Sequence, residues 1–155
     1  MALTVRRATL NDLDEVHRIE SECFAEDGFT RRQTESFLGS PRFVTLIALL
    51  DGEPVGFIVG SMDPSVQERA CHIYTLDVTG GHRRMGIGSR LLAELEKIMC
   101  GKGAEACYLE VRTDNSAAQN LYSKQGFKPL RTVKDYYGHG VDAIRLRRPL
   151  TCTQK

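Results

Sequence analysis

The chain has 155 residues, of which 41% are hydrophobic and 26% are charged, and its formal net charge is +1. This composition excludes a disordered chain, and the length predicts a single domain over residues 1–150 with a short tail over residues 151–155. The apolar runs are too short to cross a bilayer and the first residues lack the apolar segment of a secretory signal, so we expect a cytoplasmic protein with no membrane association.

The first 62 residues predict two helices that lie between strands. Thr9 and Asp12 have the spacing of a capping box at the start of the first helix. The second helix is expected to end before Pro41, because proline disfavours helical geometry in the residue that precedes it. An Asp51-Gly52 turn joins the two strands that follow. These elements are expected over residues 3–8 (strand), 10–23 and 31–38 (helices), and 43–50 and 54–62 (strands).

In the rest of the chain, strands and helices alternate. A strand over residues 70–78 precedes a long helix that begins at Met85 or Gly86 and ends at the glycines Gly101 and Gly103. The order β-α-α-β-β-β-α-β-α-β-β predicts an α/β (α+β) fold, with a mixed sheet of about seven strands and helices on both faces. The later elements are a strand over residues 106–112, a helix from Asp114 or Asn115 to Gly126, and strands over residues 127–135 and 141–148.

The turn before the long helix has the composition of a phosphate-binding loop. It reads Arg83-Arg84-Met85-Gly86-Ile87-Gly88. Glycines at a helix start let a ligand approach the backbone, and the first amides of a helix have no partner within the helix. With the helix dipole and the two arginines, they predict a site for a phosphate or pyrophosphate. The chain has neither a P-loop motif nor a Rossmann fingerprint, and the alternative is that the glycines serve only a tight turn.

Cysteines, histidines and charge distribution give weaker signals. The cysteines are five in number and no two have Cys-x-x-Cys spacing, so free thiols are expected. The four histidines lack metal-ligand spacing, so no metal site is expected. Residues 1–78 carry 7 Lys and Arg against 13 Asp and Glu, whereas residues 79–155 carry 14 against 7. This polarity fits one anionic and one cationic ligand, or a solvated surface that is merely asymmetric.

Four motifs follow one another in a fixed order. They are Thr75-Leu76-Asp77-Val78, the turn over residues 83–88, Leu109-Glu110-Val111-Arg112, and Asn115-x-x-Ala118-x-x-Leu121-Tyr122 with Gly126-Phe127. In this order they resemble the GNAT superfamily of acyl-CoA-dependent N-acyltransferases. The segment Tyr136-Tyr137-Gly138-His139-Gly140-Val141-Asp142-Ala143 is similar to a hairpin of protein N-terminal acetyltransferases, above all the bacterial ribosomal-protein-alanine branch and its archaeal relatives.

The resemblance implies a GNAT-type, mostly antiparallel sheet in one acetyltransferase domain. It implies acetyl-CoA as the acyl donor, no metal, and direct attack by the N-terminal α-amine of a protein or peptide in a ternary complex. A ribosomal protein is a candidate acceptor, no nucleic-acid partner is implied, and we expect a monomer or weak dimer. The residues implied to bind acetyl-CoA are Leu76, Asp77, Val78, Arg83, Arg84, Met85, Gly86, Ile87, Gly88, Ser89, Asn115 and Tyr122.

Glu110 is implied to be the general base. Alternation along an extended segment places Tyr108, Glu110 and Arg112 on one face, and Leu109 and Val111 on the other. A carboxyl group among apolar residues is poorly hydrated, so we expect its pKa to be raised towards the working range. Glu110 would then accept a proton directly or through water. The alternative is a structural ion pair with Arg112 or another base.

Tyr122 is implied to be the general acid that protonates the departing thiolate, and the alternative is an amphipathic core tyrosine. The strand that ends at Val78 is implied to pair with the pantetheine arm, with the Val78 amide as an oxyanion donor. Asn115 either contacts the pantetheine arm or only caps the helix that follows it.

Glu20 lies on the apolar face of the first helix, an unusual position for a carboxylate. We expect Glu20, with Tyr136 and Tyr137, to hold the acceptor N-terminus, and the alternative is the solvated edge of the helix. The chain departs from the resemblance in having no Trp after the first helix and in the turn Thr79-Gly80-Gly81-His82, which lacks the usual proline. His82 is expected to be an exposed loop histidine rather than a base.

Other functions stay open at this point. The same motifs suit acetylation of a small-molecule amine or of a lysine side chain. A regulatory module that binds CoA without turnover is a further alternative, against which Glu110 and Tyr122 speak. Binding of nucleic acid through Arg145, Arg147 and Arg148 is only weakly indicated, because no aromatic platform accompanies these arginines.

Overall fold

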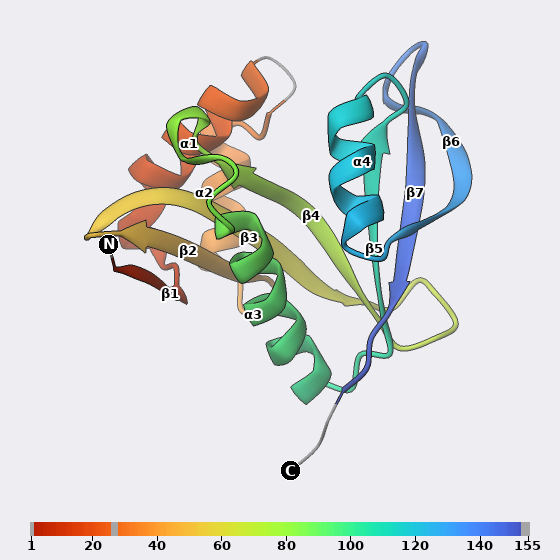
Figure 1. The fold of residues 1–155 in the computed structure, drawn as a ribbon, viewed down its shortest axis with the longest axis horizontal. Coiled ribbons are helices and arrows are strands. Elements are labelled where there is room, and N and C mark those ends of the chain that lie inside the picture. The colour runs from red at the N-terminus through yellow and green to blue at the C-terminus, as the bar shows by residue number, and fades with distance from the viewer. Residues whose placement is uncertain (1, 26–27, 153–155) are drawn as a thin grey trace. The chain divides into compact units, whose positions relative to one another are not determined.

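The computed structural model describes residues 2–25 and 28–152 (Figure 1). Its strands form one seven-stranded sheet in the order β1-β2-β3-β4-β5-β7-β6, so the predicted mixed sheet and order of elements are confirmed. The chain divides into two compact units. The first unit comprises Ile73–Ile98 and the described residues up to Ser61, and the second unit comprises Met62–His72 and the described residues from Met99 onwards.

The elements lie close to their predicted positions. The helix expected over residues 10–23 begins as a 3-10 turn over Leu10–Asp12, and Thr9 and Asp12 form the predicted capping box before it. The helices are α1 (Leu13–Phe24), α2 (Arg31–Gly39), α3 (Ile87–Gly101) and α4 (Ser116–Lys124). The strands are β1 (Leu3–Arg7), β2 (Val44–Leu50), β3 (Glu53–Asp63), β4 (Ala70–Val78), β5 (Ala106–Arg112), β6 (Lys128–Gly138) and β7 (Val141–Pro149).

In the first unit, helices cover both faces of β3. Strands β1, β2 and β3 pair antiparallel. Phe57 and Val59 of β3 belong to one buried cluster with Ile19 of α1 and Phe37 of α2. Gly56 points the other way, because a Cβ atom built on it would lie 3.4 Å from the Leu91 side chain of α3. The alternation of strand residues therefore divides the core of this unit between the two sides of the sheet.

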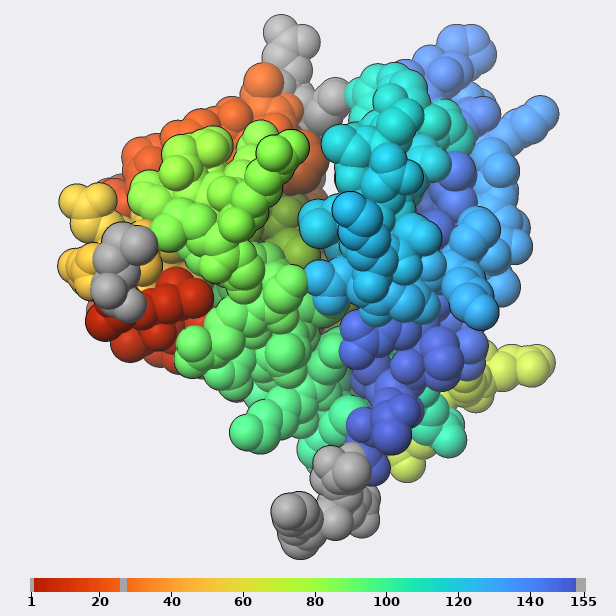
Figure 2. All heavy atoms as spheres, in the orientation of Figure 1, coloured from red at the N-terminus to blue at the C-terminus, as the bar shows by residue number. Residues whose placement is uncertain are grey.

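In the second unit, β7 pairs antiparallel with both β5 and β6. Strand β4 begins in this unit and pairs in parallel with β5 from Ala70–Ala106 to His72–Tyr108. Glu110 lies opposite Arg145 of β7, so the two share a face, whereas Leu109 and Val111 are buried on the other face as predicted. Helix α4 lies at the surface of this unit (Figure 2).

The prediction of free thiols is wrong for two cysteines. Cys100, near the end of α3, and Cys152, after β7, form a disulfide across 52 residues of sequence. The backbone brings them together, because Leu150, shortly before Cys152, donates its N–H at 2.8 Å to the carbonyl of Glu105, shortly after Cys100. Local spacing could not reveal a pair that depends on the return of the last strand. The other three cysteines are free thiols.

Within the described part of the chain, every helix is too short or too polar to traverse a lipid bilayer.

Gly56 lies close to the backbone of β4, and its replacement by alanine should destabilise the fold. A Cβ atom on Gly56 would lie 2.6 Å from the Asp77 carbonyl oxygen of β4, so one of the two strands must shift. Overpacking of this kind costs about 1–3 kcal/mol, and urea unfolding should show it as a lower midpoint. Gly101→Ala is the matched control, because a Cβ atom there meets nothing within 4 Å. Equal midpoints for the two variants would contradict this reading of Gly56.

Candidate active site

The carboxylate of Glu110 is the centre of a hydrogen-bonded cluster in the second unit. Its side chain is 3% exposed. One oxygen, Oε1, lies 2.6 Å from His72 Nε2 and 2.9 Å from the Tyr136 hydroxyl, which donates to it. The other, Oε2, accepts from Arg145 Nε at 2.7 Å. The Tyr137 hydroxyl donates to the Glu110 backbone carbonyl at 3.1 Å. Four strands thus contribute to the surroundings of this carboxylate, through β4, β5, β6 and β7.

The prediction of a raised pKa for Glu110 is wrong. Burial raises the pKa, as expected from the apolar neighbours, but the hydrogen bond and charge of His72 and the hydrogen bonds from Arg145 and Tyr136 outweigh it, so the pKa lies below its usual value. An ionised carboxylate only accepts hydrogen bonds, so His72 carries its proton on Nε2 when it faces Glu110. Burial and the same negative charge raise the pKa of Tyr136, which stays a hydrogen-bond donor.

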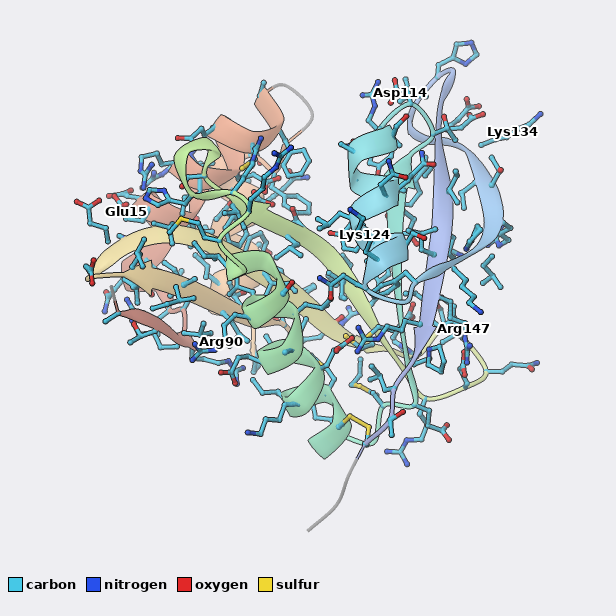
Figure 3. The ribbon with its side chains drawn as sticks, viewed as in Figure 1. Glu15, Arg90, Asp114, Lys124, Lys134 and Arg147 are labelled. Atoms are coloured by element: carbon cyan, nitrogen blue, oxygen red, sulfur yellow. A yellow bond between two sulfur atoms is a disulfide. The ribbon has the colours of Figure 1, made fainter. Side chains whose placement is uncertain are left out.

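The partners of Glu110 could not be named from sequence. The expected alternative partner, Arg112, pairs with Asp114 at 3.0 Å instead. Glu110 does form an ion pair with another basic residue, but this residue is Arg145, which lies 35 residues away in the sequence. Arg147 occupies the next position on the same face (Figure 3). Its Nε and Nη2 each donate to one carboxylate oxygen of Glu68, in the β3–β4 connection, at 2.8 Å. The available signal was the alternate spacing of Arg145 and Arg147, which places both on one face of a strand.

Tyr122 and Asn115 lie on α4 and at its start. Asn115 caps the helix, because its side chain accepts from Ala118 N–H at 3.0 Å. Tyr122 is 9% exposed and its ring packs edge-on against Phe127, with centroids 5.6 Å apart. The Arg148 guanidinium lies over the Phe127 ring, and Arg148 is on the face of β7 opposite to Arg145. Glu110 and Tyr122 therefore approach β5 from opposite faces.

The phosphate-binding turn of the first unit has the backbone geometry that its glycines predict. Arg84 and Gly86 have φ of 65° and 80°, and α3 begins at Ile87. Gly88 packs against the end of β4, since a Cβ atom on it would lie 3.8 Å from Val78 and 3.9 Å from Leu76. The structure therefore brings these predicted ligand-binding residues together, and the turn offers open backbone and the start of a helix to a pyrophosphate. This geometry fits the diphosphate of CoA.

Two side chains of the predicted binding set have partners within the first unit. Arg83 Nε donates to the Val78 carbonyl at 3.2 Å, and the Cys23 thiol donates to the same oxygen at 3.4 Å. The Asp77 side chain is 1% exposed and faces Glu20. Only the backbone of Asp77 is therefore available to a ligand.

Glu20 is buried, so the alternative of a solvated helix edge is wrong. The residue is 3% exposed, and its Oε2 accepts from Phe29 N–H at 2.9 Å. Glu20 belongs to the first unit, whereas Tyr136 and Tyr137 belong to the second unit. The two tyrosine rings meet edge-on with centroids 4.9 Å apart, and 42% and 38% of these residues are exposed.

His82, in the turn after β4, is partly buried and has a polar neighbour. His82 Nδ1 lies 2.7 Å from the Thr79 hydroxyl and the residue is half-buried, which corrects the expectation of an exposed loop histidine. Within residues 2–25 and 28–152, no three His, Cys, Asp or Glu side chains are grouped in a way that could hold a metal ion.

Comparison with known proteins gives consistent matches along the chain. The family model described as "Acetyltransferase (GNAT) family" matches residues 13–127. An N-alpha-acetyltransferase of Sulfurisphaera tokodaii is 32% identical over 94% of this chain and 92% of its own length. The crystal structure of Ard1 from Thermoplasma volcanium has a TM-score of 0.84 at 27% identity, covering 97% of this chain and 99% of that one. The ribosomal-protein-S18-alanine N-acetyltransferase of Escherichia coli also has a TM-score of 0.84, at 22% identity over 99% and 97% of the chains.

Removal of the His72 ring should raise the pKa of Glu110. Burial of the carboxyl persists in His72→Ala while one of the hydrogen bonds that lower its pKa is lost. A titration of the Glu110 side-chain carboxyl followed by carbon-13 NMR measures the midpoint directly. His139→Ala, which removes an exposed histidine of the β6–β7 turn, is the control and should leave the midpoint unchanged. A midpoint in His72→Ala that equals or lies below that of the unmodified protein would contradict the cause assigned here.

Proposed function

We propose, since the chain belongs to the GNAT acetyltransferase family, that it transfers an acetyl group to the α-amine at the N-terminus of a protein or peptide. Membership of the family makes the chain an acyltransferase with acetyl-CoA as its donor. The named relative with 32% identity is an N-alpha-acetyltransferase, which supports the α-amine as acceptor. The family match extends through residues of both units, which supports a single acetyltransferase domain over residues 1–150.

The ionised state of Glu110 carries this proposal. A carboxylate whose pKa is lowered is negative at neutral pH but is a weak proton acceptor. An α-amine has a pKa of about 7.7–8.0, so a useful fraction is already neutral near pH 7.5, whereas a lysine amine with a pKa of about 10.4 is almost entirely protonated. A weak base therefore suits an α-amine better than a lysine side chain. We infer that the site selects its acceptor partly by the basicity of the amine.

The proposed proton transfers use the two faces of β5. The neutral amine nitrogen forms a bond to the carbonyl carbon of the thioester and becomes positive, which makes its N–H far more acidic than that of a free ammonium. Glu110 takes this proton directly or through water. The bond from carbon to sulfur then breaks, and Tyr122 gives its hydroxyl proton to the departing thiolate.

Each unit has a separate task in this proposal. In the first unit, the backbone of the turn from Arg84 to Ser89 binds the pyrophosphate, and Arg83 and Met85 lie beside it. The backbone of Leu76, Asp77 and Val78 pairs with the pantetheine arm. The Val78 amide also donates to the oxyanion. Acetyl-CoA supplies the activated acetyl group. In the second unit, Asn115 keeps α4 and thereby Tyr122 in place. Tyr136 and Tyr137 offer exposed aromatic surface to the acceptor peptide.

The finer identity of the acceptor is also a proposal. The fold shared with the Escherichia coli enzyme makes a ribosomal-protein N-terminus one candidate acceptor. Glu20 is buried with its oxygens directed at Phe29 and Thr75, so we propose that it supports acceptor binding indirectly, by fixing Phe29 in front of α2.

A thiol-release assay with acetyl-CoA and a panel of acceptors tests the proposed function. Short peptides with a free α-amine should release CoA, whereas the same peptides with a blocked α-amine, peptides whose only amine is a lysine, polyamines and aminoglycosides should not. Release with the small amines or with lysine would contradict the α-amine assignment. Binding of CoA by calorimetry without release from any acceptor would indicate a regulatory module instead.

Replacement of either proposed proton carrier should reduce turnover without loss of CoA binding. Glu110→Gln keeps the shape of the side chain but removes the negative charge, and kcat should fall by about 10²–10⁴-fold. Tyr122→Phe should lower kcat to a similar extent, because it removes only the hydroxyl. Steady-state kinetics gives kcat, and calorimetry should give unchanged affinity for acetyl-CoA. Glu105→Gln, an exposed carboxylate beside the start of β5, is the control and should keep full kcat. Full kcat in both test variants would remove the mechanism.

A further inference from the structure

Two carboxyl groups face each other inside the first unit, apart from the Glu110 cluster. Glu20 comes from α1 and Asp77 comes from β4, and their exposed fractions are 3% and 1%. The Asp77 carboxyl is within hydrogen-bonding reach of the Glu20 carboxyl. Two ionised carboxylates cannot stay this close in a buried place without a strong penalty, so either a cation or a proton must lie between them.

The hydrogen-bond donors around this pair leave one of its carboxyl oxygens without a partner. Glu20 Oε2 accepts from Phe29 N–H at 2.9 Å. The Thr75 hydroxyl lies 2.5 Å from Asp77 Oδ1 and 3.4 Å from Glu20 Oε1, and its single proton is therefore assigned to Asp77. Asp77 Oδ2 is buried and no N–H or O–H group of the described residues donates to it. A proton held between the two carboxyls would satisfy this oxygen.

The charged groups around the pair do not replace that proton. The Arg83 guanidinium, from the turn after β4, lowers the pKa of Asp77 but donates to the Val78 carbonyl rather than to either carboxyl. Burial raises the pKa of the Cys23 thiol on α1 to about 11, so this group is neutral. Burial and the Glu20 carboxyl together raise the pKa of Asp77 well above its usual value despite Arg83.

We propose that Glu20 and Asp77 share one proton, and that this shared proton links Phe29, which precedes α2, to β4 and so supports acceptor binding. Glu20 is the link, because it holds the Phe29 backbone on one side and the Asp77 carboxyl on the other. Phe29 in turn packs edge-on against Phe37 of α2, with centroids 5.6 Å apart, and borders an apolar cavity of about 270 Å³ with Phe43, Val59 and Tyr74 among its other walls. Glu20 and Asp77 are positioning residues, and their effect on acceptor binding rests on the proposed function.

The shared proton makes the first unit sensitive to alkaline pH. A carboxyl group with a raised pKa in the folded state stabilises the fold fully at pH below its unfolded pKa, and this contribution is lost as the pH rises through the folded pKa. Loss of the proton leaves two adjacent negative charges, which should separate α1 from β4 and release Phe29. The pair titrates as a unit, so its apparent pKa belongs to both residues.

Thermal unfolding across pH tests the shared proton without any need for activity. The Tm of the unmodified protein should fall as the pH rises through the apparent pKa of the pair. Asp77→Asn should remove this part of the fall and raise the Tm on the alkaline side, because an amide donates to Glu20 at every pH. Glu20→Gln should behave likewise. Glu15→Gln, at an exposed carboxylate of the same helix (Figure 3), is the control and should keep the fall.

An infrared spectrum of the unmodified protein provides a second measurement that does not depend on the stability of a variant. A band of a neutral carboxyl group should persist at neutral pH and disappear as the pH rises over the same range as the fall in Tm. Persistence of the pH-dependent fall in Asp77→Asn, or absence of a neutral carboxyl band at neutral pH, would overturn the proposal.

The effect on the acceptor is measured separately. The KM for an acceptor peptide should rise with pH over the range in which the pair loses its proton, while the affinity for acetyl-CoA stays constant, and Asp77→Asn should remove this rise in KM. A KM that rises equally in Asp77→Asn would overturn the positioning role. If no acceptor is turned over, the proposed function fails, but the unfolding and infrared measurements still decide whether the proton is shared.

Discussion

Three side chains donate hydrogen bonds to the carboxylate of Glu110 at a place where only 3% of the side chain is exposed. Burial of a charge is costly, and the charge is kept only because these donors replace the lost water. The donors come from β4, β7 and β6, so the position of each strand in the second unit is tied to one carboxylate. The exposed tyrosine pair of the β6–β7 hairpin is joined to the proposed base in the same way, through Tyr136. An acceptor that contacted this hairpin would therefore also affect the proposed base.

The two buried carboxyl sites show how neighbours, rather than residue type, decide the state of an acid. Glu110 faces a histidine and an arginine, and its pKa is lowered despite burial. Asp77 faces a second carboxyl, and its pKa is raised. In both sites burial acts in the same direction, towards the neutral form. The direction of the pKa shift depends on whether the nearest partner donates a hydrogen bond to the carboxylate or is a second carboxyl group that competes for the proton.

The fold followed from features that are local in sequence. The capping box at Thr9 and the turn at Asp51-Gly52 each lie within a few residues, and the elements they predicted are present. The turn from Arg83 to Gly88 has the predicted backbone geometry because its signal is also local. Glu110 was placed correctly on a buried face, but its pKa was predicted in the wrong direction because His72 and Arg145 lie 38 and 35 residues away. The disulfide of Cys100 with Cys152 was missed for the same reason.

The same reasoning limits what can control the pH dependence of the enzyme. Because Glu110 is already ionised well below neutral pH, its titration cannot produce a rise in activity near pH 7–8. A rise in that range is instead expected from the acceptor, since an α-amine loses its proton with a pKa of about 7.7–8.0. The Glu20–Asp77 pair acts in the opposite direction, since the proposed proton supports acceptor binding only until the pH exceeds the apparent pKa of the pair. On this proposal, the acid limit of the working range is set by the amine of the substrate and the alkaline limit by the Glu20–Asp77 pair. Neither limit is set by the proposed general base, Glu110.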